Sequence, residues 1–333
     1  LVEPYGRTIT IVPNKSLVTQ TEEDFLACNL DTGVYYGDRK EVGRYNTIAT
    51  WQSLNVLEKK AKNEHSTEFK EFCDGIQTVI IDEVHMAKAD VLKRLLTGPF
   101  AHCGIRWGLT GTVPKADYEF MGLKCSIGEV ANRIQASELQ DKGVLANCHV
   151  NVLQTQDHPQ FKTYSEELKW LTTDTTRMTW VANTIKDIAT SGNTLILVDR
   201  ISAGELLEKQ IKNSVFVSGS TKNMERKEQY DEISTATNKV IIATYGVAAV
   251  GINIPRIFNL VLIEPGKSFV RVIQSIGRGI RKAQDKDSVQ IWDITSSCKF
   301  AKRHLGARKK FYKEANYPYN IEKINYENPY TRR

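Results

Sequence analysis

Short apolar runs rich in β-branched residues alternate along this chain with longer segments that carry apolar residues at helical spacing. The runs lie at residues 8–12, 47–50, 78–81, 106–109, 194–198, 215–217, 240–243, 260–263 and 289–292. They are continuous rather than alternating, which is typical of strands buried on both faces of a parallel sheet. Segments such as 203–212 and 225–233 predict helices between them. Strand and helix in alternation indicate βαβ units, and therefore an α/β fold with doubly wound parallel sheets.

A break in this pattern indicates two lobes. Between residues 130 and 190, the only strand-like run lies near 150–153. A chain of 333 residues has room for about two domains. We therefore expect an N-terminal lobe at residues 1–130, a linker with a C-terminal lobe at 131–298, and a tail at 299–333.

Composition excludes several classes of protein. Apolar residues make up 41% of the chain and charged residues 25%, as in an ordinary globular protein. No apolar stretch approaches the roughly 18 residues that would span a membrane, so we expect no membrane partner and a cytoplasmic protein, in the host cell if a phage encodes it. No two cysteines have C-x-x-C spacing, which gives little support to a zinc site. We expect reduced, buried thiols at Cys28, Cys73, Cys103, Cys125, Cys148 and Cys298.

The tail is strongly basic. Residues 299–333 carry a net charge of +7, whereas residues 1–298 carry −1. Aromatic residues interleave with the basic ones, and base stacking combined with phosphate pairing is a usual route to single-strand binding. The alternative is a helical appendage that packs its aromatic side chains on the second lobe and leaves its charges in solvent. The sequence leaves both possibilities open.

The sharpest local motif is Asp82-Glu83-Val84-His85, directly after the run at 78–81. Ligands bind at the carboxyl ends of strands in open parallel sheets. Two adjacent carboxylates there face different directions, so one can hold a metal ion while the other handles a water molecule. The alternative is a pair of acidic residues that are merely solvated.

A second motif contains two arginines, Arg278 and Arg281, after Gln274. Residues three apart share one face of a helix. A planar guanidinium group binds phosphate oxygens in a bidentate way that an ammonium group cannot match. The alternative is a pair of surface arginines on an exposed helix.

Further motifs lie at residues 11–20, 50–54, 109–112, 243–246 and 251–255. These motifs, together with those at 82–85 and 274–281, follow one another in the order found in the superfamily 2 helicases and translocases. The chain resembles that superfamily over about residues 8–293. Within that superfamily it looks most like phage branch-migration helicases of the UvsW type, and RecG-like and type I restriction motors are more distant. The resemblance implies two RecA-like lobes with ATP between them. The implied function is the motor core of an ATP-dependent DNA helicase, acting in translocation, unwinding or branch migration during repair, recombination or replication.

The resemblance also implies roles for individual residues. Asp82 would hold Mg²⁺, and Glu83 would orient and deprotonate the attacking water. Arg278 and Arg281 would be arginine fingers. The residues that would link nucleotide state to lobe closure are His85, Thr110, Thr112 and Gln274.

Other motif residues would contact the nucleotide or the nucleic acid. Gly251 and Asn253 join Thr110 and Thr112 as nucleotide-binding candidates, and Asn253 stands where the family often has Asp. The candidates for the nucleic-acid track are Pro13, Ser16, Trp51, Gln52 and Thr244. A Trp at position 51 is equally consistent with a buried core residue. We expect ATP and Mg²⁺ as cofactors, single-stranded or branched DNA as partner, and a monomer.

One family motif is missing from the printed sequence. The family carries a G-x-x-x-x-G-K-[ST] phosphate-binding loop before the strand at 8–12, and the chain starts at Leu1, too late to contain it. Because it also lacks an initial Met, we expect a fragment whose first lobe is truncated at its N-terminus. Gly266-Lys267-Ser268 does not replace the loop, since position 261 is Val rather than Gly. We expect a strand-to-helix turn there, with Ser268 near the helix N-cap.

Two other functions stay open. The first is a double-strand DNA translocase that does not separate strands. The second is a non-catalytic nucleic-acid-binding module, which the missing loop would permit. Strand displacement on a forked substrate separates the helicase from the translocase, and ATP turnover separates both from the binding module.

We predict that the chain as printed, starting at Leu1, hydrolyses ATP negligibly even with DNA, because it lacks the backbone cradle and Lys that hold the β- and γ-phosphates. Its second lobe should still fold. Phosphate release with and without DNA is the measurement, and a clear DNA-stimulated rate would contradict the expectation.

Overall fold

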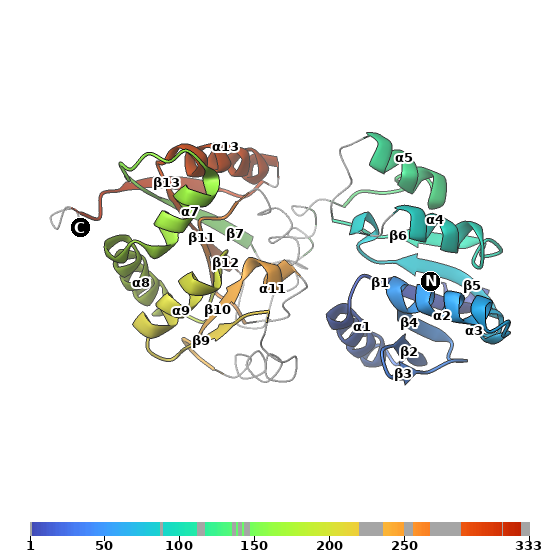
Figure 1. The fold of residues 1–333 in the computed structure, drawn as a ribbon. Coiled ribbons are helices and arrows are strands. Elements are labelled where there is room, and N and C mark those ends of the chain that lie inside the picture. The colour runs from blue at the N-terminus through green and yellow to red at the C-terminus, as the bar shows by residue number, and fades with distance from the viewer. Residues whose placement is uncertain are drawn as a thin grey trace. The chain divides into compact units, whose positions relative to one another are not determined.

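The computed structural model describes residues 2–86, 89–111, 117–134, 138, 142, 147–219, 236–249, 256–266, 288–314 and 316–327. The chain forms two compact units, Leu1–Arg133 and Ile134–Arg333 (Figure 1). Each unit is an α/β structure built on a parallel sheet.

The first unit contains a six-stranded sheet in the order β3-β2-β4-β1-β5-β6. Its strands are β1 (Arg7–Val12), β2 (Thr32–Tyr36), β3 (Arg39–Lys40), β4 (Asn46–Thr50), β5 (Ile76–Ile81) and β6 (Ile105–Gly108). All neighbouring pairs are parallel except β2 and β3. In the centre, Thr10 of β1 lies opposite Ile48 of β4 and Ile80 of β5.

Helices follow the strands of the first unit, as βαβ units require. They are α1 (Lys15–Ala27), α2 (Trp51–Asn63), α3 (Glu68–Cys73), α4 (Ala89–Thr97) and α5 (Asp117–Ser126). The starts of α1 and α2 are capped, because the Asn14 side chain accepts from the backbone N–H of Leu17 and the Thr50 side chain from that of Ser53. One apolar cluster joins α1 to the sheet, and a larger one joins α2, α3 and α4 to it. The sheet is therefore covered on both faces.

The second unit contains a seven-stranded sheet in the order β13-β7-β12-β11-β8-β10-β9, and every pair is parallel. Its strands are β7 (Asn147–Thr155), β8 (Thr194–Val198), β9 (Ser214–Val217), β10 (Val240–Thr244), β11 (Asn259–Ile263), β12 (Ser288–Ser296) and β13 (Tyr319–Ile324). Its helices are α7 (Tyr164–Thr173), α8 (Thr175–Ala189), α9 (Ile201–Gln210), α11 (Tyr245–Ala249) and α13 (Lys299–Glu314).

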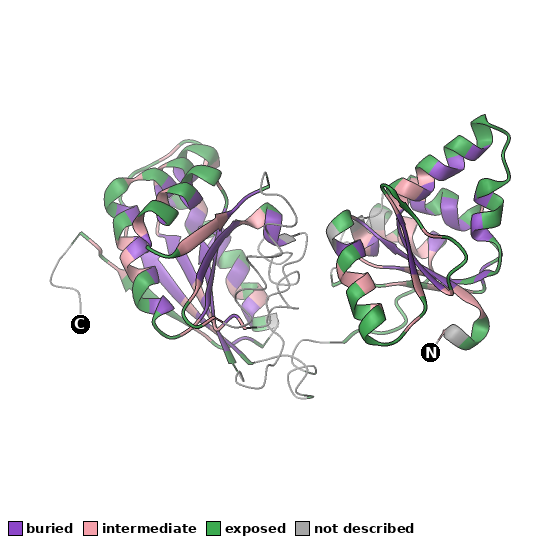
Figure 2. Ribbon diagram, turned by 90° about the horizontal axis from the view of Figure 1, so that it is seen from below, coloured by how far each residue is buried: buried purple, intermediate pink, exposed green. Residues whose placement is uncertain are grey.

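The central strands of the second unit are buried on both faces, as Figure 2 shows in purple. Alternate residues of each strand point to opposite faces, so one sheet supplies two apolar clusters. One cluster includes α11 and α13, and the other includes α8 and α9. The predicted doubly wound fold is confirmed in both units.

Buried charges hold α13 to the sheet. Arg308 of α13 binds Asp293 of β12 through two bonds, Nε to Oδ2 at 2.8 Å and Nη2 to Oδ1 at 3.0 Å. Both side chains are at most 3% exposed. The Tyr312 hydroxyl donates to the same carboxylate at 2.8 Å. At the start of the helix, the Glu167 carboxylate of α7 accepts from the backbone N–H groups of Phe300 and Ala301.

The elements agree with the strands predicted from the sequence and differ from some other expectations. The predicted strands are all confirmed, whereas β2, β3 and β13 were not predicted. The helix expected at 225–233 lies outside the described residues. The expectation of buried thiols is wrong for Cys28 and Cys125, which are exposed on α1's C-terminal end and on α5. In the basic tail, the packing alternative is confirmed for Tyr312 and Tyr317, which are buried in the core of the second unit.

No helix in the described parts of the chain has the length and apolar character needed to cross a membrane.

Replacing Arg308 should strongly destabilise the second unit. Arg308→Ala leaves the Asp293 charge buried without its cation, which typically costs about 3–5 kcal/mol. Arg303→Ala, an exposed arginine on the same helix, is the matched control and should change stability by about 0.5 kcal/mol or less. Chemical denaturation of both variants measures the difference, and equal midpoints would show that the buried pair contributes nothing to stability.

Candidate functional site

The candidate residues of the first unit gather at one edge of its sheet. Strands β1, β4, β5 and β6 are parallel, so their carboxyl ends lie at the same edge. Pro13 follows β1, Trp51 follows β4, Asp82 follows β5 and Thr110 lies just beyond β6. Ligands bind at this edge in open parallel sheets. Residues from four distant parts of the sequence therefore meet where the fold places binding sites.

Asp82 and Glu83 form a tight turn after β5. The Asp82 backbone N–H donates to the Ile11 carbonyl at 2.9 Å, which extends the pairing of β5 with β1 by one residue. Asp82 Oδ1 accepts from the Glu83 backbone N–H at 2.9 Å. Glu83 has a φ of +48°, a left-handed conformation that is uncommon for a residue with a side chain. The Glu83 side chain remains 32% exposed, so its carboxylate is open to water.

His85 connects this turn to the end of β6. Its Nδ1 lies 2.6 Å from Thr110 Oγ1 and 3.2 Å from Glu83 Oε2. With the proton on Nδ1, the ring donates toward these oxygens; with the proton on Nε2, the Thr110 hydroxyl donates to Nδ1. The structure therefore brings together three of the predicted residues, from two neighbouring strands.

Backbone hydrogen bonds also join the acidic turn to the end of β6. Leu109 N–H donates to the Ile81 carbonyl at 2.8 Å, and Val84 N–H donates to the Leu109 carbonyl at 3.0 Å. Glycine suits position 108, at the end of β6, because a Cβ there would lie only 3.2 Å from Val84 Cγ1 and 3.3 Å from Ile127 Cγ2. Movement of the segment after β6 would therefore reach the acidic turn directly.

The acidic turn suits a magnesium nucleotide. Mg²⁺ prefers oxygen ligands and is usually held by one or two carboxylates together with substrate phosphates and waters. Asp82 and Glu83 supply carboxylates of this kind at the sheet edge. Within the described residues, no group of three or more His, Cys, Asp or Glu could hold a metal by itself. The donor set therefore fits a metal that arrives with phosphate oxygens.

Two of the nucleic-acid candidates also meet. Gln52, exposed on the first turn of α2, donates through Nε2 to the Pro13 carbonyl at 3.1 Å. Trp51 is half-buried and packs against the core of the first unit. Ser16 lies in the first turn of α1.

In the second unit, Thr244 ends β10, and its hydroxyl accepts from the Val247 backbone N–H at 3.4 Å, at the start of α11. The remaining predicted site residues lie outside the described residues: Thr112, Gly251, Asn253, Gln274, Arg278 and Arg281.

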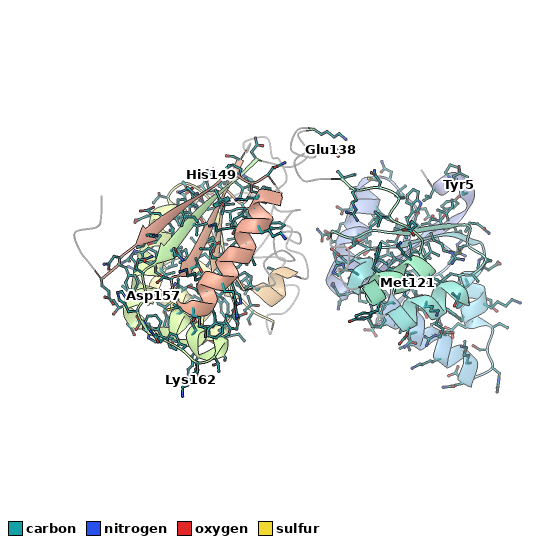
Figure 3. The ribbon with its side chains drawn as sticks, turned by 90° about the horizontal axis from the view of Figure 1, so that it is seen from above. Tyr5, Met121, Glu138, His149, Asp157 and Lys162 are labelled. Atoms are coloured by element: carbon teal, nitrogen blue, oxygen red, sulfur yellow. The ribbon has the colours of Figure 1, made fainter. Side chains whose placement is uncertain are left out.

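The sequence did not reveal a buried charge network at the carboxyl edge of the second sheet. Arg177 of α8 is fully buried and donates to the Glu264 carboxylate, which follows β11. Asp157 follows β7 and lies 3.5 Å from Arg177 Nε. Figure 3 shows Asp157 and His149 at opposite ends of β7. These partners are far apart in the chain, and a single Arg on an amphipathic helix gives no sequence signal.

Burial raises the pKa of Glu264 to about 7, against the opposing effect of Arg177 and Arg308. Between about pH 4.5 and pH 7, Glu264 is therefore protonated in the folded protein but ionised in the unfolded chain. The contribution of Glu264 to stability is present below this range and is lost as the pH rises through it.

Glu264→Gln should make the stability of the second unit less dependent on pH across that range, because Gln keeps the shape of the protonated acid and cannot ionise. Glu322→Gln, at an exposed carboxylate of β13, is the control and should behave like the wild type. Denaturation midpoints from pH 4.5 to 7.5 provide the measurement. Parallel curves for wild type and Glu264→Gln would exclude a titrating Glu264.

Two family models match the chain. One is described as the helicase conserved C-terminal domain and matches residues 176–283. The other is described as the type III restriction enzyme, res subunit, and matches residues 2–115. The second match contains the acidic turn and its neighbours Pro13, Gln52 and Thr110.

Individual proteins are similar over most of the chain. The ATP-dependent DNA helicase uvsW of Enterobacteria phage T4 is 25% identical over 326 residues, covering 92% of this chain and 62% of that protein. The chain covers 45% of each of two further curated relatives. It therefore spans about half the length of these relatives.

Solved structures share the fold. The helicase MrfA bound to DNA and AMPPNP has a TM-score of 0.65 at 13% identity, with 96% of this chain and 46% of that chain covered. Dbp5 of S. cerevisiae bound to RNA and ADP BeF3 has a TM-score of 0.60 at 15% identity, with 96% and 78% covered. At these identities the likeness concerns the fold alone.

Proposed function

Because the chain belongs to the superfamily 2 helicases, we propose that it forms the motor core of an ATP-dependent DNA helicase. The observation that carries the proposal is the acidic turn Asp82–Glu83 at the carboxyl edge of the first sheet, joined to Thr110 through His85. The similarity to a phage DNA helicase supports DNA, single-stranded or branched, as the nucleic acid.

In this proposal the two carboxylates have different tasks. Mg²⁺, when bound with ATP, would neutralise charge on the phosphate oxygens, and Asp82 would hold it. Glu83 would orient the attacking water and accept its proton on a carboxylate oxygen. The 32% exposure of the Glu83 side chain leaves room for that water.

His85 and Thr110 would transmit the state of the nucleotide. Glu83 and Thr110 both lie within hydrogen-bond distance of one ring nitrogen of His85. A change at the carboxylate would therefore alter the bond to the segment after β6. Thr112 and Gln274 are proposed to act in the same coupling, and Gly251 and Asn253 to contact the nucleotide. Arginine fingers at Arg278 and Arg281 would stabilise charge in the transition state, an effect worth about 10³–10⁵ in rate where measured.

The nucleic acid would contact the same edge of the sheet. Gln52 is exposed and holds the Pro13 carbonyl, so a strand bound there would meet a preformed polar surface. Ser16 and Trp51 belong to the proposed track in the first unit, with Trp51 contributing mainly through packing. Thr244, at the carboxyl end of β10 in the second unit, is a further proposed contact. The track would contact the backbone of one strand and would not read its bases.

A double-strand translocase is the second candidate, favoured by the match to the res subunit of type III restriction enzymes. Strand displacement on a forked DNA substrate distinguishes the two. A helicase releases the labelled strand in an ATP-dependent way, whereas a translocase turns over ATP on duplex DNA and leaves the fork paired.

Glu83→Gln in the full-length protein should lower ATP turnover by roughly 10²–10⁴-fold and leave ATP and DNA binding largely intact, because Gln keeps the shape but cannot accept the proton. Glu64→Gln, at an exposed carboxylate just after α2, is the control and should retain wild-type turnover. Steady-state phosphate release with saturating DNA measures both. Turnover of Glu83→Gln within a few-fold of wild type would remove Glu83 from this role.

A further inference from the structure

Helix α13 presents two chemically different faces. Its inner face carries Ala301, His304, Leu305, Arg308 and Tyr312, all buried. Its outer face carries Lys299, Lys302, Arg303, Lys310 and Lys313, all exposed, with Lys309 half-buried beside them. We name these six basic residues the outer basic face.

The acids that contact α13 lie on its inner side or at its start. Asp293 is bound by Arg308 and Tyr312, and Glu167 accepts from the first backbone N–H groups of the helix. In the part of the chain that the structure describes, Lys302, Arg303 and Lys313 form no ion pair. These three cations of the outer basic face are therefore not neutralised in the way that Arg308 is on the inner face.

Helix stability does not account for all of these cations. Basic residues are favourable near the C-terminus of a helix, which suits Lys310 and Lys313. Near the N-terminus they are unfavourable, and Lys302 and Arg303 lie within the first five residues of α13. Helix stability therefore does not explain the cations at these two positions.

Four of the described aromatic residues of this segment pack against other parts of the protein. Tyr312 and Tyr317 are buried in the core. Tyr326 stacks on Trp180, with ring centroids 5.9 Å apart, and donates to Asp157 Oδ1 at 2.7 Å. Phe300 lies beneath Arg303, whose guanidinium carbon is 5.1 Å from the ring centroid. Tyr312 and Tyr317 therefore cannot stack on bases, and Phe300 and Tyr326 already contact side chains of the protein.

From these observations we propose that the outer basic face of α13 binds the phosphate backbone of duplex DNA, apart from the track at the strand ends. The inference rests on the proposed function, in which the DNA is single-stranded or branched, because a branched DNA has duplex arms. From Lys302 to Lys313 the helix extends about 16 Å, and over that length a duplex carries roughly ten phosphate charges. Gly306 and Ala307 are exposed between the basic residues, so a backbone can approach closely.

This surface is separate from Thr244 within the second unit. Helix α13 packs on β12, and β11 and β8 lie between β12 and β10, the strand that Thr244 ends. Contacts to phosphate position a protein on DNA and carry no sequence information. The surface would therefore hold a duplex arm whatever its sequence.

The test compares Lys302→Ala/Arg303→Ala with Lys186→Ala/Lys209→Ala, a control that removes the same charge from exposed positions of α8 and α9. Affinity for two unrelated duplexes is measured at several salt concentrations, together with a melting curve. The α13 variant should bind both duplexes roughly tenfold or more weakly at 0.1 M salt. Its salt dependence should be shallower by about two units of slope. Its melting temperature should be unchanged or higher, and the control should match the wild type.

Duplex binding tests the role of the outer basic face, whereas ATP turnover tests the helicase proposal. An unchanged affinity and slope in the α13 variant would overturn the inference, as would a lowered melting temperature with an unchanged slope. Loss of binding only to vesicles of phosphatidylcholine and phosphatidylserine, with duplex binding intact, would overturn it in favour of a membrane surface. DNA-stimulated ATP turnover by the full-length wild type is measured separately, and its absence would refute the helicase proposal without touching the binding result.

Discussion

Parallel pairing of the strands is the constraint on which both units depend. Except for the β2–β3 pair, every neighbouring pair of described strands is parallel, so each connection must cross over the sheet. The crossing helices bury both faces, which explains why the central strands are apolar throughout. The same geometry puts all the carboxyl ends at one edge. Pro13, Gln52, Glu83 and Thr110 lie at the same edge of the first sheet for this reason.

Local backbone geometry then refines that edge. The Asp82 N–H continues the β5–β1 pairing by one bond, and the next residue turns into the left-handed region. A residue with a side chain adopts that conformation only where its surroundings hold it. Here the Asp82 carboxylate and the backbone bonds between Val84 and Leu109 do so. The acidic turn is therefore held by hydrogen bonds on the side of the sheet, while the Glu83 side chain is partly exposed to solvent.

Charge is arranged differently in the second unit. Its carboxyl edge buries Arg177, Glu264 and Asp157 together, and Arg308 and Asp293 pair beneath α13. Buried ions are costly unless they are paired and hydrogen-bonded, so each of these groups fixes the position of its partner. The result is a helix, α13, whose inner face is neutralised by buried acids while its outer basic face meets solvent.

Local sequence patterns predict most of the strands that are buried on both faces, and not the exposed edge strand β13. The strands at 8–12, 78–81 and 260–263 were predictable because burial on both faces requires continuous apolar runs. The acidic turn was predictable because it directly follows such a run. Strand β13 was not, since four of its six residues are exposed at the edge of the sheet and no apolar run marks them.

The sequence by itself determined the fold class, the order of most strands and helices, and the position of the acidic motif at a strand end, because periodicity and local motifs record burial and backbone direction. Only the tertiary structure decided which distant charges pair, as in Arg177 with Glu264, and which way the side chains of the basic segment point. The physical reason is that charge pairing depends on distance in space and on the exclusion of water. Arg177 and Glu264 are 87 positions apart in the chain, so no local sequence pattern indicates that they are close in space or shielded from water.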